Sequence, residues 1–145
     1  MIRFENTTVI DRPAAQVFDF LADLENLPRW NYAVVETEKI SDGSVGVGIR
    51  YRQVREFLGR RIEDQFEVTA YEPAKRLAIE STVPGLFPFA FVYELAPVHG
   101  NTRITNSVTL EPQGALRLAS PLVASRVKSA VDANLARLKE IIESS

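Results

Sequence analysis

The sequence contains no cysteine, one histidine, one methionine and one tryptophan in 145 residues. The absence of cysteine excludes disulfides, thiolate nucleophiles and cysteine-ligated zinc. Metal binding needs three or four convergent ligands; with one histidine only carboxylates remain, no EF-hand spacing groups them, and we expect no metal site. The single histidine, His99, lies in the turn-like stretch PVHGN without a serine–aspartate pair around it, which argues against a catalytic triad.

Long hydrophobic runs and a strong charge of either sign are also missing. The formal net charge is −2. A chain with so little net charge has no overall attraction for phosphate backbones, so we expect no nucleic-acid partner. The N-terminal stretch MIRFENTTVIDRP has polar residues within its first eight positions and lacks the long apolar stretch of a signal peptide or membrane span, which predicts a cytoplasmic protein without a membrane span.

The residues that are present suit one compact domain. Hydrophobic residues make up 46% of the chain and charged residues 25%, which allows a chain of this length to bury a sizeable core. No repeat, linker or low-complexity tract divides the sequence, and glycine and proline fall singly at places that are typical of turns. We therefore expect a single domain over residues 1–145.

The N-terminal part of the chain predicts one strand followed by helical turns. Residues 2–10 alternate in the manner of a strand, and apolar residues then recur at helical spacing, which predicts two short helices. Pro28 is expected to end the second helix by pushing Leu27 toward an extended conformation. We interpret Trp30, the only tryptophan, as a residue that pins these helices to the sheet.

From residue 34 to residue 112 the hydrophobic period changes to two. Short turns separate six further strands, which predicts antiparallel hairpins. The expected strands are residues 34–40, 46–57, 60–71, 76–83, 87–96 and 102–111. Residues 114–144 then carry one apolar helical stripe, in which Pro121 marks either a kink or a staggered start.

These elements have one obvious way to pack. A seven-stranded antiparallel sheet with one apolar face buries that face by curling around a single long amphipathic helix. We therefore predict an α+β fold, with a seven-stranded curved antiparallel sheet around a long C-terminal helix and two short helices between strands 1 and 2. One helix cannot fill the whole concave face, so the remaining space is expected to be a cavity.

The chain resembles the START-like (SRPBCC) helix-grip superfamily in four stretches: VIDRPAAQVFDFLADLENLPRW, GVGIRYRQVREFLGRRIEDQFEVTAYEP, TRITNSVTLEP and NLARLKEII. Within that superfamily it is most similar to the small bacterial proteins labelled polyketide cyclase/dehydrase and lipid-transport domains. The resemblance covers essentially the whole chain. It implies a deep apolar cavity between the sheet and the C-terminal helix, entered near the two short helices and the strand-end loops, with a ligand that differs from member to member.

Strand parity selects the side chains that face this cavity. Pairing across a two-residue Leu58–Gly59 turn places Tyr51 opposite Phe66, and this mostly apolar parity is expected to be the concave face. The polar residues on the same face are Tyr51, Gln53, Arg55, Asp64, Ser81, Tyr93 and Asn106. Burial without a partner would cost roughly 1 to 3 kcal/mol for each such group, so they should bond to one another, to water or to a ligand.

These polar groups would orient the carboxylate, phenol or carbonyl of a ligand while apolar residues hold its body. The predicted ligand-binding residues are Tyr51, Gln53, Arg55, Asp64, Phe66, Ser81, Phe89, Phe91, Tyr93, Asn106, Val108, Val127 and Val131. For Arg55 and Asp64 we favour the alternative that the two side chains form an ion pair near the strand ends, where solvent reaches them.

Three further motifs have simple explanations. Arginines between residues 50 and 61 alternate with acidic residues, which indicates cross-strand charge pairs and not a basic patch. GVG at residues 46–48 lacks the helix that phosphate binding requires, so we expect no cofactor, and a bulge or a close backbone approach explains it. VPGLFPFAF at residues 83–91 places Leu86 and Phe87 in a loop that either packs as an ordinary hairpin, which we favour, or forms an apolar rim that gates the cavity or meets a partner subunit.

Three functions compete at this point. We favour the binding or transport of a small hydrophobic molecule in the cavity, because no catalytic constellation is recognisable. The second is a polyketide cyclase or dehydratase that uses polar cavity residues such as Arg55 or Tyr93 to polarise a carbonyl or move a proton. The third is a regulatory interaction module acting through a sheet edge or the 83–91 loop. The sequence permits a homodimer without requiring one.

Overall fold

The computed structural model describes residues 1–57, 59–85 and 87–145. The elements are β1 (Ile2–Ile10), α1 (Ala14–Ala22), the 3₁₀ turn η1 (Leu24–Asn26), α2 (Leu27–Trp30), β2 (Val34–Lys39), β3 (Arg50–Phe57), β4 (Arg60–Glu72), β5 (Arg76–Val83), β6 (Phe89–Val98), β7 (Asn101–Leu110), the 3₁₀ turn η2 (Gly114–Arg117) and α3 (Ser120–Glu143). The sequence interpretations of Leu58 and Leu86 fall outside the described residues.

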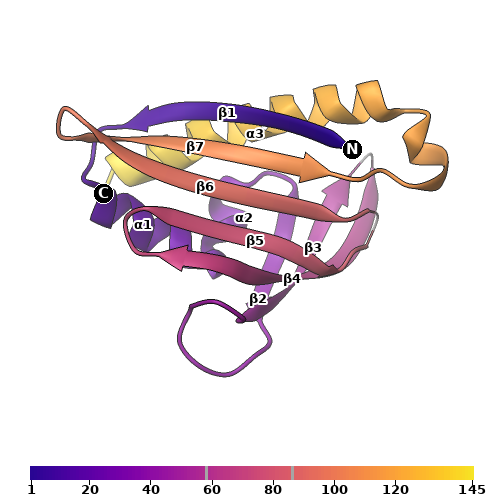
Figure 1. Cartoon of the computed structure of the whole chain (residues 1–145), viewed down its shortest axis with the longest axis horizontal. Coiled ribbons are helices and arrows are strands. Elements are labelled where there is room, and N and C mark those ends of the chain that lie inside the picture. Colours follow the sequence, from indigo (N-terminus) through magenta and orange to yellow (C-terminus); the bar gives the residue numbers. More distant parts are fainter. Residues whose placement is uncertain (58, 86) are drawn as a thin grey trace.

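All seven strands belong to one antiparallel sheet in the order β1-β7-β6-β5-β4-β3-β2. Each strand from β2 to β6 pairs with the next strand along the chain, and β1 pairs with β7. Figure 1 shows the sheet curving, with α1, α2 and α3 on the same side of it. The predicted α+β helix-grip architecture is confirmed.

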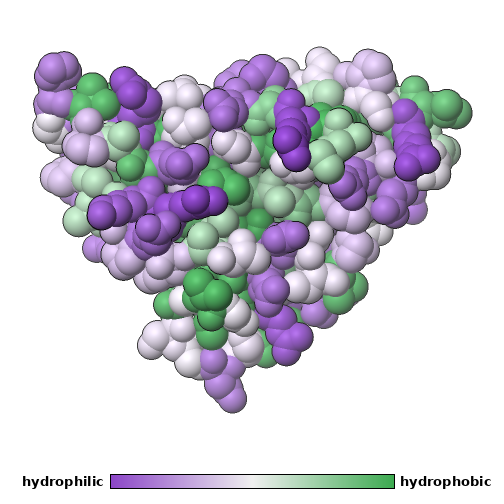
Figure 2. Space-filling view, viewed as in Figure 1, coloured by the Kyte–Doolittle hydropathy of each residue, from purple (hydrophilic) through white to green (hydrophobic). Residues whose placement is uncertain are grey.

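The outer face of the sheet is the polar one. Figure 2 views the molecule from this side and shows hydrophilic side chains spread across it, with smaller hydrophobic areas between them. Along β4, burial alternates strictly, so that Ile62, Asp64, Phe66 and Val68 are buried and their neighbours are not. Tyr51 lies opposite Phe66, as the parity of the two strands predicts. The sheet therefore turns one face of period-2 residues toward the helices.

The helical turns before β2 differ from expectation. Leu27 is helical, with φ −47° and ψ −44°, and Pro28 lies in the first turn of α2 instead of ending the preceding helix. Proline fits a first helical turn, because the N–H that it lacks would have no partner there. Burial of Leu27 and Trp30 outweighs the extended preference of a residue before proline. Trp30 is only 2% exposed and its ring meets that of Tyr93 edge-on at 6.2 Å, which agrees with a pinning role.

The predicted start of the strand at residue 46 is wrong, since β3 begins at Arg50 and the preceding residues form a loop. Gly48 has a φ of +91°, which an L residue rarely adopts. Its N–H donates to the carbonyl of Val68 at 2.8 Å, and Ile49 accepts from the N–H of Val68 at 2.9 Å. The GVG stretch is thus a turn that brings the backbone onto β4, in line with the close approach expected there.

The C-terminal helix has a staggered start. η2 ends at Arg117, and Pro121 lies in the first turn of α3, so that proline does not kink the helix. α3 contains 24 residues, about 36 Å at 1.5 Å per residue. Its buried residues are Val123, Val131, Asn134, Leu135, Leu138 and Ile142. Across the described parts of the chain, no helix combines the length and apolarity that a membrane crossing needs.

We predict that Gly85→Ala lowers the free energy of unfolding by about 1 to 3 kcal/mol, measured by urea denaturation. Gly85 lies in the loop between β5 and β6, where an added Cβ would come within 2.3 Å of Ile62 Cγ2 and 2.6 Å of the Glu63 carbonyl oxygen. The loop would have to lift away from β4. Gly46→Ala is the control, since its nearest contact would be the Ser44 carbonyl oxygen at 3.9 Å. Equal stability of both variants would contradict close packing of this loop.

Candidate functional site

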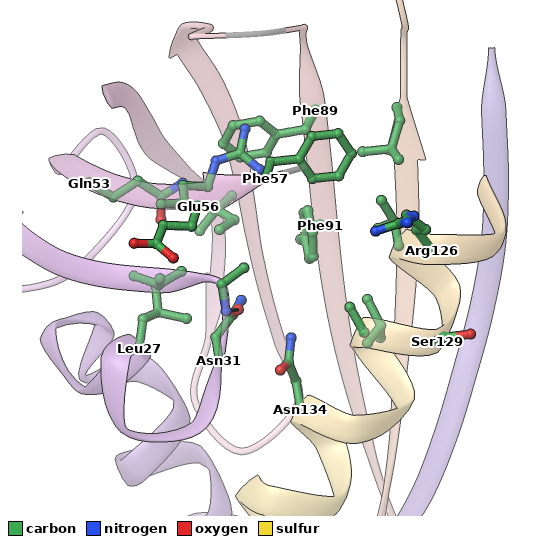
Figure 3. A pocket seen from close by; sticks show the side chains of 18 of the residues that line it. Leu27, Asn31, Gln53, Glu56, Phe57, Phe89, Phe91, Arg126, Ser129 and Asn134 are labelled. Atoms are coloured by element: carbon green, nitrogen blue, oxygen red, sulfur yellow. Dashed lines mark hydrogen bonds between the residues drawn. The ribbon is translucent and has the colours of Figure 1, made fainter. Parts of the chain in front are cut away.

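A pocket of about 410 Å³ lies between the sheet, the end of α2 and the first half of α3. Its lining residues are Leu27, Asn31, Ala33, Val34, Gln53, Arg55, Glu56, Phe57, Ile79, Phe87, Phe89, Phe91, Tyr93, Leu110, Ser125, Arg126, Val127, Ser129, Ala130, Val131 and Asn134. Figure 3 shows them surrounding an open space beside α3. This volume falls in the range of about 300 to 1,000 Å³ that is typical of small-molecule sites.

The pocket opens to solvent between β3 and α3. Its fully exposed lining residues are Glu56 on β3 and Ser125, Arg126, Ser129 and Ala130 on α3. Residues lining the opposite end, such as Leu27 and Tyr93, are buried. The mouth therefore lies along the first half of α3. The segment after α2 borders it too, because the Glu56 N–H donates to the Ala33 carbonyl at 2.7 Å and Tyr32 is 70% exposed.

The lining includes about half of the residues that the sequence predicts for ligand binding. Those in the lining are Gln53, Arg55, Phe89, Phe91, Tyr93, Val127 and Val131. Those outside it are Tyr51, Asp64, Phe66, Ser81, Asn106 and Val108. Except for half-buried Ser81, the second group is buried against other side chains. Tyr51, for example, stacks on Phe66 at 5.3 Å.

An aromatic wall forms one side of the pocket. Phe89, Phe91 and Tyr93 are alternate residues of β6, and their ring centroids are separated by 5.8 Å and then 6.4 Å. Phe57 and Phe87 add an edge-on pair at 5.8 Å near the β3–β4 hairpin. Such a wall provides a large apolar contact area for the body of a ligand.

Arg55 both lines the pocket and forms an ion pair with Asp64, which were the two alternatives that the sequence left open. Its Nε–H donates to Asp64 Oδ2 at 2.8 Å, and its guanidinium lies 5.2 Å from the centroid of the Phe89 ring. The ion pair exists, but the expected solvent access is wrong: the side chain of Asp64 is 0% exposed and that of Arg55 16%. The β5–β6 loop covers Asp64, since a Cβ on Gly85 would come within 3.3 Å of the Asp64 Cβ.

The ion pair is not fully satisfied. Arg55 Nη2 and Asp64 Oδ1 are buried and have no hydrogen-bond partner within the described residues. An unpaired guanidinium N–H is a strong donor in a site with little water. Arg55 also belongs to the pocket lining, so its guanidinium places a positive charge beside the Phe89 ring in a wall that is otherwise apolar.

Burial holds the tyrosine hydroxyls of this face in their neutral form. It raises the pKa of Tyr93 well above its usual value. It also raises the pKa of Tyr51 to about 12, with smaller contributions from the charges of Glu25 and Asp23. A neutral phenol can donate and accept hydrogen bonds, but it is a poor base near pH 7. Tyr93 can therefore orient a ligand or donate to it, without acting as a general base.

Two asparagines of the pocket lining were missed from the sequence. Asn31 follows α2, and Asn134 lies on α3 between Val131 and Leu138, within the buried stripe. The side chain of Asn134 accepts a hydrogen bond from the Tyr32 N–H at 3.0 Å. A polar residue inside an apolar helical stripe is a signal that sequence reasoning could have used.

The other missed residues are apolar wall residues or lie at the mouth. Leu110 shares the parity of Val108 on β7, and Phe87 lies in the loop before β6; neither was selected from the sequence. In the described part of the chain, no cluster of three or more histidine, aspartate or glutamate side chains could hold a metal ion.

Comparisons with known proteins give one family and one fold. The family model described as polyketide cyclase / dehydrase and lipid transport matches residues 1–143. A search of curated proteins by sequence gave no significant match. A solved structure from Thermus thermophilus is 21% identical, with a TM-score of 0.85, over 99% of this chain and 98% of that one.

Two further solved structures share the fold at lower identity. A START superfamily protein from Mycobacterium smegmatis has a TM-score of 0.83 at 15% identity, covering 98% of this chain and 97% of that one. The Zhui aromatase/cyclase of Streptomyces sp. R1128 has a TM-score of 0.81 at 15% identity, covering 98% and 93%. At these identities the likeness establishes the fold and leaves the ligand open.

We predict that removing only the arginine of the buried ion pair destabilises the protein more than removing both partners. In Arg55→Met the Asp64 carboxylate stays buried without a counter-charge, which should lower the free energy of unfolding by about 3 to 5 kcal/mol in urea denaturation. Arg55→Met/Asp64→Leu should recover most of this loss, because apolar side chains of similar size need no partner.

Arg52→Met provides the comparison at the surface. Arg52 pairs with Glu36 and Glu63 and its side chain is 29% exposed, so its loss should cost less than about 1 kcal/mol. A double Arg55/Asp64 variant that is no more stable than Arg55→Met alone would contradict the account of an unsatisfied buried carboxylate.

Proposed function

Since the chain belongs to the polyketide cyclase/dehydrase and lipid transport family, we propose that it binds or transports a small hydrophobic molecule in the pocket between the sheet and α3. The observation that carries this proposal is the pocket itself, with its volume of about 410 Å³ and its wall of Phe89, Phe91 and Tyr93. A protein that had no use for the space could fill it with larger side chains, because closely packed interiors are more stable.

The lining fits an apolar ligand with a polar end. Apolar side chains come from every element around the pocket, including Leu27, Ile79, Leu110 and Val131. The polar side chains of the lining that are not exposed are those of Asn31, Gln53, Arg55, Tyr93 and Asn134. Binding sites for small molecules commonly combine such an apolar body with a few convergent polar groups.

We expect 1-anilinonaphthalene-8-sulfonate to bind at one saturable site with a marked rise in its fluorescence, because its rings would leave water for the aromatic wall. Ala130→Phe should weaken this binding at least about tenfold, since a larger side chain at the mouth would occupy the pocket. Ala133→Phe is the matched control, because this exposed residue of the same helix is not part of the lining and its substitution should leave the dissociation constant unchanged.

Binding that is the same in both variants would place the dye outside the pocket and contradict the proposal. The natural ligand is sought separately, by organic extraction of the purified protein and mass spectrometry. An extract from wild type that contains a hydrophobic molecule missing from Ala130→Phe supports the proposal, and identical extracts count against it.

A second candidate function is a cyclase or dehydratase, and Arg55 is the observation that favours it. Arg55 lines the pocket, and its guanidinium could polarise a ligand carbonyl there. In an intramolecular aldol condensation, a carbon next to one carbonyl bonds to a second carbonyl carbon and one water leaves, without any oxidant or cofactor.

If this function holds, incubation with a linear β-polyketone that carries an aromatic end group should give a product that has lost one water, detected by mass spectrometry. The Arg55→Met/Asp64→Leu variant should lose this turnover while keeping its fold, because it lacks the guanidinium but leaves no buried charge unpaired. Turnover that persists in this variant, or that is absent from wild type for every mimic tried, would exclude the role of Arg55.

A further inference from the structure

We propose that the ligand carries a hydrogen-bond acceptor, a carbonyl or carboxylate oxygen, and that the side-chain NH₂ groups of Asn31 and Asn134 hold this oxygen. The inference rests on the proposed binding function and narrows the class of ligand. It follows from the orientation of the two side-chain amides. The backbone N–H groups of Tyr32 and Ala33 determine this orientation.

The amide of Asn134 can face only one way. Its Oδ1 accepts a hydrogen bond from the Tyr32 N–H at 3.0 Å. A backbone N–H can only donate, so the oxygen must occupy this side and the NH₂ group the other. The residue is only 6% exposed and belongs to the pocket lining. Its Nδ2 makes no hydrogen bond within the described residues, which leaves a donor on a buried residue that needs an acceptor.

Asn31 is oriented by the same principle. Its Oδ1 accepts from the Ala33 N–H, two residues along the chain, also at 3.0 Å. This Asx-type turn directs the NH₂ group away from its own backbone. Figure 3 shows the amides of Asn31 and Asn134 reaching into the same part of the pocket, one from the end of α2 and one from α3. Two donors therefore converge where the segment after α2 faces α3.

The groups around the two amides also favour a ligand that accepts hydrogen bonds. Arg55 presents only N–H groups, and its carboxylate partner Asp64 is not part of the lining. Tyr93, near the inner end, keeps its phenolic proton because burial raises its pKa. The one acidic residue in the lining, Glu56, is exposed at the mouth. An ammonium would thus meet only this solvated carboxylate, with which an ion pair contributes little, whereas a carbonyl oxygen would satisfy both amides.

Three tricyclic probes test this inference with shape held constant. 9-Fluorenone, fluorene and carbazole share one skeleton and differ in a bridging carbonyl, methylene or N–H group. Their affinities are measured by competition with 1-anilinonaphthalene-8-sulfonate. For wild type we expect fluorenone to bind about tenfold more tightly than fluorene, and carbazole no more tightly than fluorene.

Asn134→Asp and Asn31→Asp change the donor and keep the oxygen that the backbone N–H needs. In each variant the preference for fluorenone over fluorene should fall about tenfold, and carbazole should gain relative to fluorene, because its N–H meets an acceptor. A merely structural defect would weaken all three probes alike. Asn31 is half-buried, so its variant keeps the test available if a carboxylate at Asn134 prevents folding. Asn101→Asp is the matched control outside the lining.

Equal affinities of wild type for fluorenone and fluorene would overturn the inference, as would an unchanged preference in both aspartate variants. Failure of all three tricycles to displace the dye would overturn it as well. If the dye still binds in the pocket in any of these cases, the proposed binding function stands and only the assignment of the acceptor fails. If the dye does not bind either, both fail together.

Discussion

The structure depends on one constraint, which is that a single helix must cover the apolar face of a seven-stranded sheet. α3 packs mainly along β1, at one edge of the sheet. The sheet curves so that Phe66, Val68 and Leu77 also become buried, and α1 and α2 close much of what remains. The uncovered part between β3, β6 and α3 is the pocket. The cavity is thus a consequence of how little helical surface the chain provides for so wide a sheet.

The polar groups of the concave face are held in place by contacts that do not involve a ligand. Asp64 fixes the guanidinium of Arg55 from behind, and backbone N–H groups fix the amides of Asn31 and Asn134. Each of these partners is an oxygen or N–H withdrawn from the pocket. These three side chains therefore turn hydrogen-bond donors toward a pocket that is lined by aromatic rings. Their orientation is fixed before a ligand binds.

Much of the fold could be predicted, because the hydrophobic periods of 2 and 3.6 residues follow directly from the local geometry of strands and helices. Parity placed Tyr51 opposite Phe66 and on the buried face, and the structure agrees. The prediction that a helix ends at Leu27 was wrong, because burial of Leu27 and Trp30 outweighed the extended conformation that a residue before proline prefers. The site was predicted less well: parity identifies a face, but it does not tell which part of that face other elements cover. Tyr51 and Asn106 lie on the right face and outside the pocket for this reason.

The sequence by itself determined the order of elements, the helix-grip architecture and the apolar character of the concave face, since each follows from spacing along the chain. Only the tertiary structure decided where the pocket lies and what it offers. Gly85 lets a distant loop close over Asp64, and Tyr32, 102 residues before Asn134, sets the direction of its amide. Such contacts join segments whose separation in sequence carries no periodic signal, so their outcome depends on how the sheet curves around α3.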